Sequence, residues 1–283
     1  MTLKTIDDVR ALIAANPVSG TPAEMRAAFA RLAAAPAAEN VGATPLVLGS
    51  IDALSVGEGP TLLWLHGGGL VFGGPETHLA LAAHLAGRGL RVVLPAYRLA
   101  PDHVWPAQIE DTMAALDALS GPVAIGGDSA GGLLALEAAQ RRPGRAFALA
   151  LLSPNTDRTG ATAEVRAAQS EHDAMNDDEQ DAALARLAFE DRDGWDPEVS
   201  PRLGPLDHLP PTFLAACPDE VLSEDARLLA DGIHEVGGGC DFTLWDGMFH
   251  MWPLWPNAIP EGAEALDRIA AFVQAEAARS SAG

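Results

Sequence analysis

Two short motifs hold the residue types needed to attack an acyl carbonyl. Residues 66–69 read His-Gly-Gly-Gly and follow the apolar run of residues 61–65. Residues 127–131 read Gly-Asp-Ser-Ala-Gly and follow a second apolar run, residues 122–126. Glycines leave backbone N–H groups open to a ligand, and a serine on a tight turn between a strand and a helix presents its hydroxyl. Together these groups predict attack on an ester carbonyl and stabilisation of the oxyanion that forms.

Ser129 is the predicted nucleophile, and because its hydroxyl is weak at neutral pH it needs an adjacent base. When the serine lies on such a turn, the acid and then the histidine follow it along the chain. Of the eight histidines, His250 fits this order, since it lies in a loop just beyond the predicted strand of residues 240–246. His234 falls inside a helical pattern, and His66 belongs to the glycine motif, where we expect it to hold the loop.

Two adjacent acids, Asp219 and Glu220, follow the predicted strand that contains residues 212–216. The acid of a triad fixes the tautomer of the histidine and stabilises the imidazolium that forms during the reaction. Only one of two neighbouring side chains can face His250. The residue types alone leave both acids as candidates.

Apolar runs alternate with helical patterns from about residue 61 onward, which predicts an α/β fold with a parallel sheet covered by helices on both faces. The predicted strands are residues 61–67, 91–98, 123–127, 147–153, 211–217 and 240–246. The predicted helices are residues 77–89, with Thr77 as the N-cap, 106–119, 129–142, 223–236 and 261–278.

Two segments interrupt this alternation. Residues 1–40 are alanine-rich and helical in pattern, and residues 158–205 are rich in acids and helix formers, with no predicted strand. The second segment is longer than a crossover between parallel strands requires, so we interpret it as an insertion. We expect both segments to lie over the strand ends as a cap. The catalytic domain would then comprise residues 41–157 and 206–283.

The formal net charge is −21, which argues against nucleic acids and anionic membranes as partners. The acid excess is consistent with solubility alone or with adaptation to salt. Because the chain has no apolar run of membrane-spanning length and no signal-peptide pattern, we expect a cytoplasmic protein. The spacing of Cys217 and Cys240 suits neither a zinc site nor a disulfide framework, so we expect two buried thiols. No metal or organic cofactor is expected.

Three motifs resemble those of a known family. They are the His-Gly-Gly-Gly of residues 66–69, the Tyr-Arg-Leu-Ala-Pro-Asp of residues 97–102 and the Gly-Asp-Ser-Ala-Gly-Gly of residues 127–132. From about residue 60 to residue 255 the chain resembles the bacterial hormone-sensitive-lipase-like esterases, which have the α/β-hydrolase fold. The family usually has Glu in the last position of the second motif, where this chain has Asp102.

The resemblance implies that the amides of Gly68, Gly69 and Ala130 form the oxyanion hole. It also implies that Ser129 is the nucleophile and that His250 is the base.

Aligning the family's acid motif with residues 211–213 places the acid on Glu220, with Asp219 as the alternative. The resemblance further implies that residues 97–102 support the oxyanion loop through an ion pair and a turn.

The function that the resemblance implies is hydrolysis of small, soluble carboxylic esters with short acyl chains. An amidase or aryl formamidase with the same triad is an alternative, and a receptor that has lost its chemistry is a more distant one. Family members are often dimers through their last strand and helix, so a homodimer is a further expectation. The candidate pocket walls are Leu70, Phe72, Trp195, Met248 and Trp252.

Overall fold

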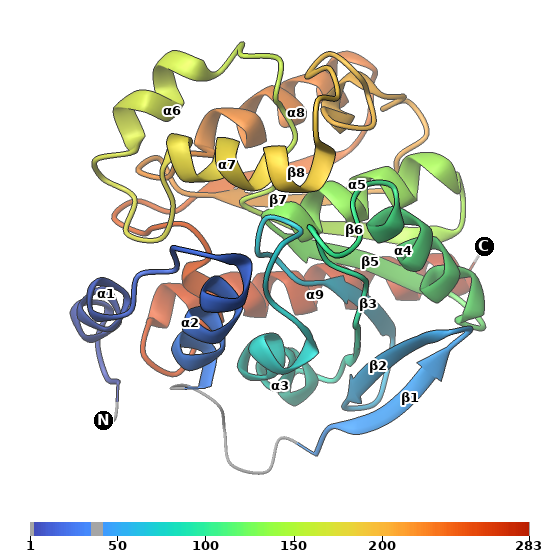
Figure 1. Ribbon diagram of the computed structural model, residues 1–283. Coiled ribbons are helices and arrows are strands. Elements are labelled where there is room, and N and C mark those ends of the chain that lie inside the picture. Colours follow the sequence, from blue (N-terminus) through green and yellow to red (C-terminus); the bar gives the residue numbers. More distant parts are fainter. Residues whose placement is uncertain (1–2, 35–41, 283) are drawn as a thin grey trace.

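A twisted sheet of eight strands runs through the part of the chain that the computed structural model describes, residues 3–34 and 42–282 (Figure 1). The strand order is β1-β2-β4-β3-β5-β6-β7-β8. The hairpin of β1 and β2 joins β4 in antiparallel fashion, and all pairs from β4 to β8 are parallel. The strands are β1 (Thr44–Leu48), β2 (Ile51–Val56), β3 (Thr61–Leu65), β4 (Arg91–Pro95), β5 (Val123–Asp128), β6 (Ala146–Leu152), β7 (Thr212–Ala216) and β8 (Cys240–Leu244).

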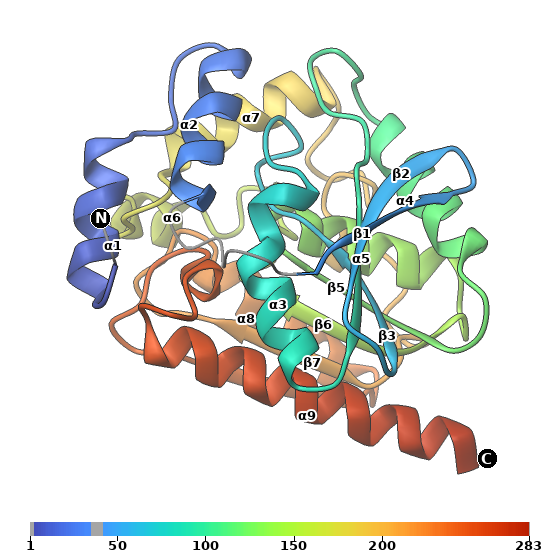
Figure 2. The ribbon, with the colours of Figure 1, turned by 90° about the horizontal axis from the view of Figure 1, so that it is seen from below.

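Helices cover both faces of the sheet, which confirms the predicted α/β fold. On one face lie α3 (Leu79–Gly87) and α9 (Pro260–Ala282), which contact each other (Figure 2). On the other face lie α4 (Ala107–Ala118), α5 (Ala130–Arg141) and α8 (Ser223–Glu235). Every residue of β5 and β7 is buried, as expected for parallel strands covered on both sides.

Four further helices lie outside these two layers, on the same side of the molecule (Figures 1 and 2). They are α1 (Ile6–Ala15), α2 (Pro22–Ala34), α6 (Ala163–Gln169) and α7 (Asp178–Phe189). The predictions that the N-terminal segment is helical and that residues 158–205 contain no strand are confirmed. The predicted boundary at residue 40 lies outside the described residues. No helix in the described part of the chain is both long and apolar enough to cross a membrane.

Short 3-10 turns η1 (Pro75–His78), η2 (Pro201–Leu203) and η3 (Trp252–Leu254) complete the structure. The first of them corrects the predicted start of α3. The Thr77 hydroxyl donates to the Gly74 carbonyl and accepts from the Gly74 N–H, so it closes η1 instead of capping the helix. The helix therefore begins at Leu79.

The hairpin of β1 and β2 was absent from the predicted strands. Its first strand is largely exposed and contains a proline, so it lacks a strong hydrophobic pattern. A two-residue turn joins the strands, and Gly49 there has φ +65°, a conformation that favours glycine.

Candidate active site

The two motifs emerge side by side because β3 and β5 are parallel neighbours, with Leu65 paired to Gly127. Ser129 follows β5 on the sharp turn into α5, with φ 54° and ψ −123°. Such a left-handed conformation is rare for serine and is typical of a strained functional turn. A β-carbon on Gly131 would overlap the Leu65 carbonyl, so only glycine permits this close approach.

The glycine loop leaves amide groups free at this edge of the sheet. Gly68 and Gly69 have φ +120° and +59°, and a β-carbon on Gly68 would overlap the Phe72 carbonyl. In the described part of the chain, no hydrogen bond uses the N–H of Gly68, Gly69 or Ala130. Unpaired donors converging beside a serine could bind an oxyanion.

The buried carboxylate of Asp128 links the serine turn to the glycine loop. It accepts from the Gly67 N–H at 3.0 Å and from Trp64 Nε1 at 2.9 Å, and it lies 3.1 Å from His78 Nε2. Burial would raise the pKa of Asp128, but His78 and Trp64 together hold this pKa below its usual value. A charged side chain next to Ser129 therefore fixes the position of the loop.

His66 packs against Tyr97, whose ring stacks on the imidazole with centroids 4.1 Å apart. The Tyr97 hydroxyl donates to the His66 carbonyl at 2.6 Å. Burial lowers the pKa of His66 to about 3, and so the ring is neutral at physiological pH. These contacts provide a second support for the glycine loop.

Arg98 and Asp102 each form an ion pair, but not with each other. Arg98 instead forms a bidentate pair with Asp111 of α4, and its Nη2 lies 2.8 Å from Oδ1. Asp102 pairs with Arg26 of α2, also at 2.8 Å. Both partners come from other elements, so spacing along the chain could not reveal them.

His250 and Glu220 meet in the loops that follow β8 and β7. His250 Nδ1 lies 3.2 Å from Glu220 Oε2, and Glu220 Oε1 accepts from the Cys217 N–H at 3.2 Å. Glu220 is completely buried, whereas Asp219 is partly exposed and makes no hydrogen bond to His250 within the described residues. Of the two candidate acids, the structure brings Glu220 to the histidine.

The pKa of His250 is set by opposing effects. Burial would lower it, but the hydrogen bond to Glu220 and the charges of Glu220, Asp173 and Asp128 together raise it above the usual 6.5. The ring is thereby a stronger base than an isolated histidine.

Ser129 and His250 line one small cavity together with Gly68 and Gly69. The cavity has a volume of about 20 Å³, which is room for about one water molecule. Among the described residues no hydrogen bond joins the Ser129 hydroxyl to the imidazole, and such bonds often tighten only when substrate binds. The other lining residues are Val18, Phe72, Met175, Asn176, Gln180, Asp181, Leu184 and Met251.

The predicted pocket walls are divided between three environments. Phe72 lines the cavity. Leu70, Met248 and Trp252 are buried in the hydrophobic core and do not line it. Trp195 is 64% exposed on the surface. Five of the twelve lining residues instead come from the insertion, and none of these five was marked by a sequence motif.

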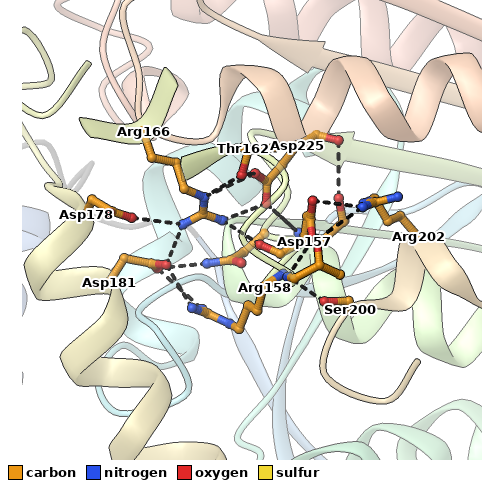
Figure 3. Close-up of polar contacts among 12 residues, drawn as sticks. Asp157, Arg158, Thr162, Arg166, Asp178, Asp181, Ser200, Arg202 and Asp225 are labelled. Carbon is orange, nitrogen blue, oxygen red and sulfur yellow. Dashed lines mark hydrogen bonds and ion pairs between the residues drawn. The ribbon is translucent and has the colours of Figure 1, made fainter. Parts of the chain in front are cut away.

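A buried charge network fixes the insertion beside this cavity (Figure 3). Arg166 of α6 pairs with Asp181 of α7 at 2.8 Å and with Asp225 of α8 at 2.7 Å. Arg158 also pairs with Asp181 at 2.8 Å. Burial would raise the pKa of Asp181, but the two arginines lower it strongly. Since Asp181 also lines the cavity, the network positions α7 against the site.

Asp173, between α6 and α7, is a residue near the site that the sequence did not single out. Its carboxylate accepts from the backbone N–H of His250 at 3.1 Å and of Val221 at 3.2 Å. It is one of many acids in the insertion, and no motif marks it. No group of three or more residues that could hold a metal ion occurs in the described ranges.

Comparison with known proteins agrees with this architecture. A sequence model for a family described as the alpha/beta hydrolase fold matches residues 62–254. An acetyl-hydrolase of Streptomyces hygroscopicus is 35% identical over 233 residues, covering 77% of this chain and 76% of the relative. An esterase of Acinetobacter venetianus is 31% identical, covering 74% of this chain and 72% of the relative.

Comparison with solved structures identifies the same kind of protein. One crystal structure, of an esterase from the bacterial hormone-sensitive lipase family, superposes with a TM-score of 0.88 at 31% identity. The match covers 95% of this chain and 97% of that one. This chain therefore belongs to the bacterial hormone-sensitive-lipase-like family of carboxylesterases, which is built on the α/β-hydrolase fold.

Proposed function

We propose that the protein hydrolyses short-acyl carboxylic esters through an acyl-enzyme formed on Ser129. The observation that carries this proposal is the placement of Ser129 and His250 in one cavity, with Glu220 on the far nitrogen of the imidazole. Gly68 and Gly69 line the same cavity.

In the first half of the reaction, His250 Nε2 takes the proton of the Ser129 hydroxyl as its oxygen attacks the acyl carbon. The amides of Gly68, Gly69 and Ala130 donate to the tetrahedral oxyanion. The imidazolium then gives its proton to the alkoxy oxygen, and the alcohol leaves.

In the second half, His250 removes a proton from a water molecule that attacks the acyl carbon of the ester on Ser129. The second oxyanion collapses, the proton returns to the serine oxygen, and the carboxylic acid is released. Throughout, Glu220 accepts from Nδ1–H, which keeps Nε2 free to accept and stabilises the imidazolium.

Short acyl chains are favoured by the small cavity and by the side chains that close it. Leu184 of α7 packs directly over Gly69, and Val18 precedes α2. We propose that the N-terminal helices and the insertion form a cap that must move to admit an ester. The Streptomyces relative, named as an acetyl-hydrolase, supports a short acyl group here as well.

The Ser129→Ala variant tests the proposal. It removes the nucleophile, so kcat for p-nitrophenyl acetate should fall by about 10⁶-fold while circular dichroism and the melting temperature stay unchanged. Turnover of p-nitrophenyl esters against matched anilides distinguishes an esterase from an amidase, and we expect the esters to react far faster. Retained ester hydrolysis by a folded Ser129→Ala protein would contradict the mechanism.

A further inference from the structure

The carboxylate of Asp173 connects the insertion to both loops that carry the histidine and its acid. Oδ1 accepts from the N–H of His250 at 3.1 Å, and Oδ2 accepts from the N–H of Val221 at 3.2 Å. Val221 directly follows Glu220. One side chain therefore clamps the backbone beside Glu220 to the backbone of His250.

A role confined to the local turn would not need these contacts. The turn itself is satisfied by the Met175 N–H, which donates to Oδ1 at 3.0 Å. The other two bonds reach residues far along the chain, on the loops after β7 and β8. Hydrogen bonds from amides to a carboxylate are stronger than those between neutral groups. Both loops are thus held by a charge that the insertion supplies.

The charged groups around this clamp belong to three parts of the molecule. Three carboxylates act on His250: that of Glu220 in the loop after β7, that of Asp173 in the insertion and that of Asp128 in β5. Asp173 in turn faces His250 and Glu220. Burial raises the pKa of Asp173 to about 6, the charge of Glu220 adds to this rise, and His250 opposes it.

We propose that Asp173 is a positioning residue, which sets the geometry of His250 and Glu220 only when the insertion is docked against the catalytic domain. This inference rests on the proposed roles of His250 and Glu220. It gives the insertion a part in catalysis beyond covering the cavity, because undocking it would release both loops. Loss of the Asp173 carboxylate should lower kcat more than it raises KM, since Asp173 does not line the cavity that holds Ser129 and His250.

The test compares Asp173→Asn with the control Glu171→Gln, in the full chain. Both remove one negative charge from the same segment, and Glu171 is exposed. We expect Asp173→Asn to lower kcat for p-nitrophenyl acetate by about 10²-fold, as small misplacements of catalytic groups do, with KM changed less than about threefold. The acid limb of kcat/KM should shift to lower pH, because His250 loses a neighbouring negative charge. The control should match the unmodified protein in kcat, in KM and in the position of the acid limb of kcat/KM.

A folded Asp173→Asn protein with unchanged kcat and an unchanged acid limb would overturn the inference, while leaving the proposed function intact. If the unmodified protein did not hydrolyse esters, the proposed function itself would be overturned. Hydrogen exchange of the unmodified protein supplies a test that needs no variant. The amides of Val221 and His250 should exchange slowly, and exchange as fast as that of exposed amides would refute the clamp.

Discussion

Two clusters of charge flank the cavity, and they are compensated differently. Around Arg166, the guanidinium groups of the insertion meet aspartates of α7 and α8 at 2.7–2.8 Å (Figure 3). Around His250, the carboxylates of Glu220 and Asp173 face one imidazole. The first cluster balances buried negative charge with arginines, which keep their protons at all relevant pH values. In the second, a histidine faces two acids, and no arginine of the described residues pairs with either of them.

The pKa shifts follow this difference. Burial disfavours the charged form of Arg166, but its aspartates outweigh this and raise its pKa, and the two arginines lower the pKa of Asp181. Burial raises the pKa of Asp225, although Arg166 opposes the rise. In the second cluster, Asp173 has a pKa of about 6 and His250 a pKa above its usual value. Arginines pair the charges that hold the helices together, whereas carboxylates surround His250, the proposed base, and raise its pKa.

Removing Glu220, the acid of the second cluster, should lower kcat far more than removing the arginine of the first cluster. Glu220→Gln keeps the size of the side chain but can no longer stabilise the imidazolium, so kcat should fall by about 10⁴-fold. Asp219→Asn is the matched control, because Asp219 is adjacent and does not contact His250, and its kcat should stay within about threefold. Steady-state kinetics with p-nitrophenyl butyrate would measure both. A larger loss in Asp219→Asn would transfer the role of the acid to that residue.

Removing the arginine of the first cluster should affect stability instead of chemistry. Arg166→Met leaves the buried carboxylate of Asp225 without its cation, and breaking a buried ion pair in this way costs about 3–5 kcal/mol. Urea unfolding followed by circular dichroism would measure the loss. At a temperature where the variant is folded, kcat per folded molecule should fall far less than in Glu220→Gln. A stability equal to that of the unmodified protein would show that the network adds nothing to folding.

The pH dependence of catalysis should reflect the second cluster alone. His250 must be neutral to accept the proton of Ser129, so kcat/KM should rise with pH as the imidazole loses its proton. Because the pKa of His250 is raised, the midpoint should lie above 6.5. A flat profile from pH 5 to 8 would contradict the assignment of His250 as the base.

The sequence predicted the parts of the site that follow from order along parallel strands. The two strand ends next to the motifs were predicted at residues 67 and 127 and lie at 65 and 128, and they follow from apolar runs and turn residues that are local in the chain. The position of the histidine beyond residue 246 follows in the same way. The fold class follows from the alternation of these runs with helices. Glu220 and Asp219 remained alternatives, because which of two neighbours faces inward depends on the backbone of a loop.

Features that depend on contacts between segments distant in the chain could not be predicted from the sequence. Asp173 contacts the backbone of His250, 77 residues away in the chain, and no motif distinguishes it from the other acids of its segment. The partners of Arg98 and Asp102 were missed for the same reason. The walls of the cavity were mostly misplaced because an aromatic side chain suits a core as well as a pocket.

The central claim is that Ser129, His250 and the amides of Gly68, Gly69 and Ala130 act on a single carbon atom. A crystal structure of the protein after reaction with a p-nitrophenyl alkylphosphonate tests it most directly. We predict phosphorus bonded to Ser129 Oγ, a phosphonyl oxygen about 3 Å from those amides, and the imidazole of His250 within hydrogen-bond reach of the adduct. Phosphorus on another residue, or an imidazole turned away from the adduct, would contradict the account.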